Sequence, residues 1–90
     1  MGKFNELLDI PMSYLGKIPK ISIVGFDEVL IENYNSILEY ESFFVRVSTH
    51  IGNININGFN LTLTQMNEYD ILVKGIISSL DFEKEKENDI

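Results

Sequence analysis

Residues 53–63 read Asn-Ile-Asn-Ile-Asn-Gly-Phe-Asn-Leu-Thr-Leu, and this stretch decides the fold. Apolar and polar residues alternate on both sides of Gly58. Such alternation is typical of half-buried β-strands, whose successive side chains point to opposite faces of a sheet. The residues Gly-Phe-Asn in the middle have turn chemistry. The stretch therefore predicts two short strands, over 53–58 and 60–66, joined by a tight turn.

The same period of two continues along the chain on both sides of this stretch. We expect strands near residues 20–25, 28–33, 36–41, 43–49, 53–58, 60–66 and 70–79. The last strand is expected to be bulged at Gly75, because glycine inside a strand often marks a bulge. The intervening turns are too short for crossover helices, so the sheet is expected to be antiparallel. The predicted fold is a mainly β, small single-sheet domain, a sandwich or roll of about seven short strands.

The first twenty residues follow a different period. Five apolar side chains fall on one stripe at helical spacing, which predicts a short amphipathic helical lead over residues 3–16, broken at Pro11. This stripe is a candidate docking element, and it consists of Phe4, Leu7, Leu8, Met12 and Leu15. Three surfaces can bury it: its own sheet, a protein partner, or a membrane face.

The length of 90 residues predicts one domain. We expect this domain to span residues 1–83, followed by a charged, disordered tail over residues 84–90. The charged run that forms the tail begins at Glu83, so we expect the chain to fray from this residue onward. The side chains expected in the core come from the alternating pattern and are Ile23, Val45, Val47, Ile54, Ile56, Leu63 and Val73.

Charge and composition exclude several classes of function. The net charge is −7, the wrong sign for a protein that binds by neutralising phosphates, so no nucleic-acid partner is expected. The chain has no Cys, which excludes disulfides, thiolate zinc sites and cysteine nucleophiles. It shows no secretory signal and no apolar run long enough to span a membrane, so we expect a cytoplasmic protein with no direct membrane insertion.

The residues that could carry chemistry are few. His50 is the single histidine, and the carboxylates spaced by two residues are Glu39 and Glu41, Glu68 and Asp70, and Asp81 and Glu83. Such pairs could serve glycosidic chemistry or calcium binding, but solvated strand faces are the favoured interpretation. Likewise, Asn53, Asn55 and Asn57 predict an outward polar ladder, either facing solvent or pairing with a neighbouring molecule. We expect no catalytic residue, no metal site and no cofactor.

The order of segments resembles that of a known family. A short helix reaches Asp9-Ile-Pro, followed by Ile18-Pro-Lys-Ile-Ser-Ile-Val-Gly and then Val29-Leu-Ile-Glu-Asn. The match continues through residues 52–61 and 70–82. The chain thus resembles the YabP/YqfC family of sporulation proteins over residues 5–83, and within it the YqfC-like branch.

This resemblance implies a non-enzymatic protein of endospore-forming bacteria, made in the mother cell. It also implies a membrane-protein partner encoded nearby and a location in the mother-cell cytoplasm, peripheral to the outer forespore membrane. The family has no catalytic motif, so no residue inherits a role. Two other functions remain open, a β-module that forms homo-oligomers through exposed strand edges and a small hydrolase or sugar-binding domain that uses the paired carboxylates.

Overall fold

The computed structural model describes residues 18–84, which form one antiparallel sheet of six strands in the order β1-β2-β6-β5-β4-β3. The prediction of a mainly β, antiparallel domain is confirmed. The expected helical lead over 3–16 and residues 85–90 of the expected tail lie outside the described residues. The strands are β1 Lys20–Val24, β2 Glu28–Glu32, β3 Tyr34–Glu41, β4 Phe44–Thr49, β5 Gly52–Thr64 and β6 Asp70–Lys84.

The stretch that suggested two strands is a single strand. β5 runs through Gly58, Phe59 and Asn60 without a turn, so the expected break at these residues is wrong and the sheet has six strands. The reason is a close approach of two backbones: a Cβ on Gly58 would collide with the carbonyl oxygen of Ile76 on β6. Glycine is needed here for proximity, and not to reverse the chain.

β5 and β6 both bend where their pairing shifts. Asn60 and Leu61 together lie opposite Gly75, and Ser78 is the extra residue of a second irregularity on β6. Asn60 adopts a positive φ of 54°, which asparagine tolerates better than most residues. The expected bulge therefore lies at the position of Gly75, but the extra residue is on β5.

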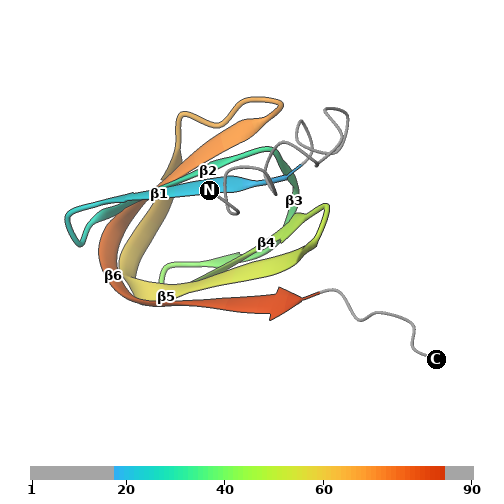
Figure 1. The fold of residues 1–90 in the computed structure, drawn as a ribbon. Helices are drawn as coiled ribbons and strands as arrows, with labels where there is room; N and C mark the ends of the chain where they lie inside the picture. The colour runs from blue at the N-terminus through green and yellow to red at the C-terminus, as the bar shows by residue number, and fades with distance from the viewer. Residues whose placement is uncertain (1–17, 85–90) are drawn as a thin grey trace, which may run out of the picture.

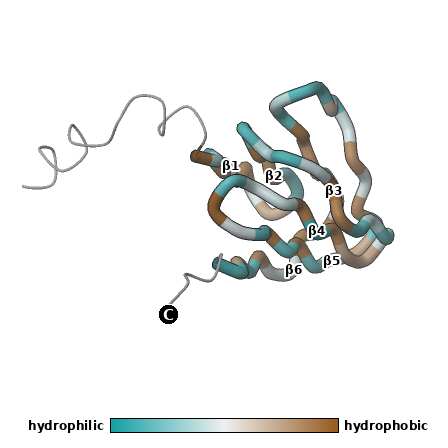
Figure 2. The backbone as a smooth tube through the Cα atoms, turned by 90° about the vertical axis from the view of Figure 1, so that its right-hand side faces the viewer, coloured by the Kyte–Doolittle hydropathy of each residue, from teal (hydrophilic) through white to brown (hydrophobic). Residues whose placement is uncertain are grey.

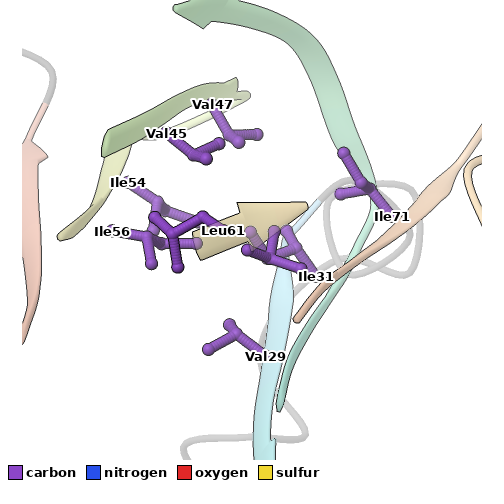
Figure 3. Packing of buried hydrophobic residues seen from close by; sticks show 9 residues of the cluster. Val29, Ile31, Val45, Val47, Ile54, Ile56, Leu61 and Ile71 are labelled. Carbon is purple, nitrogen blue, oxygen red and sulfur yellow. The ribbon is translucent and has the colours of Figure 1, made fainter. Parts of the chain in front are cut away.

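The bends fold the sheet over on itself as two leaves (Figure 1). The upper leaf contains β1, β2, the start of β6 and the end of β5, and the lower leaf contains β3, β4, the start of β5 and the end of β6. The inner faces of both leaves supply the core (Figure 3), whose buried side chains are Val29, Ile31, Val45, Val47, Ile54, Ile56, Leu61, Ile71 and Val73. The alternation of hydrophilic and hydrophobic residues that produces these faces is visible along the chain in Figure 2.

Most of the expected core is confirmed. Five of the seven residues are buried, and Leu63 packs partly buried against them. The prediction that Ile23 lies in the core is wrong, since this residue is 54% exposed. It lies on β1, an edge strand, so no strand of residues 18–84 flanks it on its outer side, although its register partner Val29 is fully buried.

The chain first crosses from the upper to the lower leaf at Asn33. Asn33, with a φ of 67°, separates β2 from β3, which stand at different places in the strand order. The backbone N–H groups of Asn33 and Tyr34 both donate to the carbonyl of Tyr69, at 2.7 and 3.2 Å. At the other end of the chain β6 extends to Lys84, so Glu83 and Lys84, the latter assigned to the tail, belong to the sheet.

Candidate interaction surface

The polar ladder on the outer face of the lower leaf is a structural network centred on Glu83. Asn53 Nδ2 and Asn55 Nδ2 donate to its carboxylate at 3.1 and 2.9 Å, and Arg46 Nη2 lies 2.8 Å from it. Arg46 Nε also donates to Asn55 Oδ1 at 3.1 Å. Hydrogen bonds from Asn55 and Asn53, together with Arg46, hold the pKa of Glu83 below its ordinary value.

The three Asn side chains of the polar ladder, Asn53, Asn55 and Asn57, make hydrogen bonds within the domain. Asn55 is 8% exposed because Arg46 and Glu83 lie against its amide, and Asn57 donates to Ser79 Oγ at 3.1 Å. In the described part of the chain, every buried side-chain polar atom has a hydrogen-bond partner. The polar ladder therefore stabilises the pairing of β4, β5 and β6 across the sheet.

The carboxylate pairs do not form one site. Glu39 lies 3.7 Å from Arg46, at the edge of the network described above. Glu68 lies in the connection between β5 and β6 and Asp70 begins β6, where its backbone N–H donates to Asn67 Oδ1 at 2.8 Å. Among residues 18–84, no three His, Cys, Asp or Glu side chains are grouped so that they could hold a metal ion.

His50 lies in the turn between β4 and β5. It lines an open polar hollow of about 660 Å³ together with Asn35, Asn53 and Glu83. The carboxylate in this hollow is that of Glu83, which already accepts hydrogen bonds from Asn53 and Asn55.

The candidate docking stripe, Phe4, Leu7, Leu8, Met12 and Leu15, lies outside the described residues. The structure does describe the surface beside the point where that segment joins the sheet. Pro19 and Ile21 line an apolar groove of about 240 Å³ together with Ile51, Ile54 and Phe82. Pro19, near the start of the described residues, is thus part of this groove.

A second apolar surface, which we call the apolar ridge, lies where β5 and β6 bend. Its four members are all more than half exposed: Phe26 at 86%, Phe43 at 59%, Phe59 at 60% and Ile76 at 57%. Phe59 and Ile76 are register partners on adjacent strands, so their side chains share a face. The ridge was not predicted, because its members are far apart in the sequence. The available signal was that Phe26 and Phe59 are large aromatic residues at positions where turns were expected.

None of the described residues forms a helix with the length and apolar character needed to cross a membrane. A comparison with protein-family models matches residues 16–89 to the YabP family. No curated protein and no solved structure gave a significant match. The matched range includes both leaves, the polar network around Glu83 and the apolar ridge.

Proposed function

The chain belongs to the YabP family, and from this premise we propose that it is a non-enzymatic interaction module that acts in the mother cell during sporulation. Family membership itself indicates a sporulation-related protein. The proposal adds the compartment and the mode of action: the protein binds a membrane protein at the forespore surface, and the partner is encoded nearby. The YqfC-like branch, from which the partner is inferred, rests on the sequence resemblance.

The family match carries this proposal, and three features of the domain support it. The candidate carboxylates stand apart, and Glu83 is used by hydrogen bonds within the sheet. Four large apolar side chains remain exposed on the apolar ridge. The described residues carry nine acidic and four basic side chains, which suits the Lys- and Arg-rich cytoplasmic flanks of membrane proteins.

The test is the location of the protein in sporulating cells. The full chain, fused to a fluorescent protein and expressed from its own promoter, is expected to appear in the mother cell and to collect around the forespore. Salt or detergent should release it from the membrane fraction, because it is held through a partner. Fluorescence confined to the forespore, or spread evenly through the mother cell, would contradict the proposal.

Self-association through strand edges is the second candidate. β1 and β3 are both edge strands of the sheet, and an exposed edge is a template for pairing with another chain. Glu39 and Glu41 on β3 oppose this pairing through like-charge repulsion. Sedimentation velocity over a hundredfold range of concentration distinguishes the two functions, since a partner-dependent module stays monomeric while an edge-pairing module grows.

A further inference from the structure

We propose that the apolar ridge, formed by Phe26, Phe43, Phe59 and Ile76, is the docking surface for a basic, apolar segment of the partner protein. This inference rests on the proposed function, and it assigns a surface and a ligand chemistry to it. The ridge is not required by the core, backbone hydrogen bonds hold its two turns in place, and its charged surroundings select a basic ligand.

The ridge lies on the solvent side of the sheet. Ile77 packs against the core, so Ile76, the preceding residue of the strand, points away from it. None of the four ridge residues belongs to the core cluster. Single exposed apolar residues are ordinary on protein surfaces, but four large ones gathered in one region mark an interaction site.

Backbone hydrogen bonds hold the two turns that carry Phe26 and Phe43 against the strands that carry Ile76 and Phe59. The N–H of Ile77 donates to the carbonyl of Phe26 at 3.0 Å, which fixes the β1–β2 turn against β6. The N–H of Gly58 donates to the carbonyl of Phe43 at 3.1 Å, which fixes the β3–β4 turn against β5. Both turns meet the bend of β5 and β6 at the left of Figure 1. Because the backbone of both turns is held in this way, the turns lose little backbone conformational entropy on binding.

The charge around the ridge selects the ligand. Asp27 follows Phe26 directly, Glu41 stands two residues before Phe43, and the residues 18–84 carry a net charge of −5. Lys74, the nearest base on β6, is already 3.7 Å from Glu28. Anionic lipid would be repelled by this surface, and a second copy would bring its own acids against Asp27 and Glu41. A segment with an apolar face flanked by Lys or Arg can pack against the ridge and complement the charge of Asp27 and Glu41.

Peptide binding to the full chain tests the surface directly. The probe is a synthetic amphipathic peptide of Leu and Lys, compared with the same peptide carrying Glu in place of Lys, and amide shifts are followed by NMR. We expect the Leu/Lys peptide to shift residues at the ridge, and the Leu/Glu peptide to leave them unchanged. The double variant F59S/I76S should weaken binding about tenfold or more.

Phe82→Ser is the matched control, because Phe82 is 59% exposed, like Phe59, but lines the apolar groove beside Pro19. Circular dichroism confirms that each variant is folded. Four results would each overturn the inference: no binding of the Leu/Lys peptide, shifts centred on the groove, equal binding of both peptides, or preferential binding of the ridge to phosphatidylglycerol vesicles or to a second copy.

Localisation in cells separates this inference from the proposed function. If both hold, the wild-type fusion collects at the forespore and F59S/I76S does not, while Phe82→Ser behaves as wild type. If the ridge is the wrong surface, the folded double variant still collects there. If the wild-type fusion itself does not collect, the proposed function fails, and the peptide experiment alone decides whether the ridge is a binding surface.

Discussion

Arg46 on β4 and Glu83 on β6 form an ion pair of 2.8 Å although the whole of β5 lies between their strands. Asn55, on that central strand, connects them, since it accepts from Arg46 and donates to Glu83. Three strands of the lower leaf are thereby joined through side chains as well as through their backbones.

The pH dependence of stability reports this network. The pKa of Glu83 is lowered in the folded protein, so its ionised form stabilises the fold at pH values above the ordinary pKa of 4.5. That contribution is lost as the pH falls through the lowered folded pKa. We expect Glu83→Gln to flatten the loss of unfolding free energy below pH 4.5, measured by urea unfolding between pH 3 and 7. Glu41→Gln, outside the network, is the control, and the same pH profile in both variants would contradict the prediction.

Gly58 should tolerate no side chain. An added Cβ would meet the carbonyl oxygen of Ile76, which belongs to the paired strand and cannot turn aside. We expect Gly58→Ala to lower the free energy of unfolding by about 2–3 kcal/mol, through displacement of β6. Gly25→Ala is the comparison, because its Cβ would meet only Asp27 Oδ1 at 3.4 Å, and its cost, which comes from a φ of 60°, should be about 1 kcal/mol. Equal costs at the two positions would contradict the close approach.

The inner faces of the two leaves should carry most of the stability. Ile56 is fully buried, and Ile56→Ala is expected to cost about 2–5 kcal/mol, measured by chemical unfolding. Ile23→Ala removes the same atoms from a side chain that is 54% exposed, and it should cost about 1 kcal/mol or less. A large loss at Ile23 would mean that β1 is covered in solution.

Deletion of residues 1–18 tests the candidate docking stripe. If the stripe packs into the groove lined by Ile21 and Phe82, the free energy of unfolding of the shortened chain should fall by about 2 kcal/mol or more, measured by thermal unfolding. A shortened chain that keeps its melting temperature but no longer collects at the forespore would assign the stripe to a partner. If both properties survive, the stripe has neither role.

The sequence predicted the strands well because alternation is a local property. It failed where two separate segments meet. Gly58 looks the same in a sequence whether it reverses the chain or admits the carbonyl of Ile76, so the pattern predicts two strands where the structure has one bent strand. Ile23 and Ile31 share the same pattern, yet only Ile31 has strands on both sides. The apolar ridge depends on the register of β5 against β6, which no local pattern contains.

The way β5 and β6 run through both leaves governs how the protein unfolds. Each of these strands begins in one leaf and ends in the other, so neither leaf has a complete set of strands of its own. Opening one leaf removes hydrogen bonds and apolar contacts from the other. The domain should therefore unfold in a single cooperative transition, with the amides of Val29 in one leaf and Val45 in the other exchanging with solvent through the same global opening.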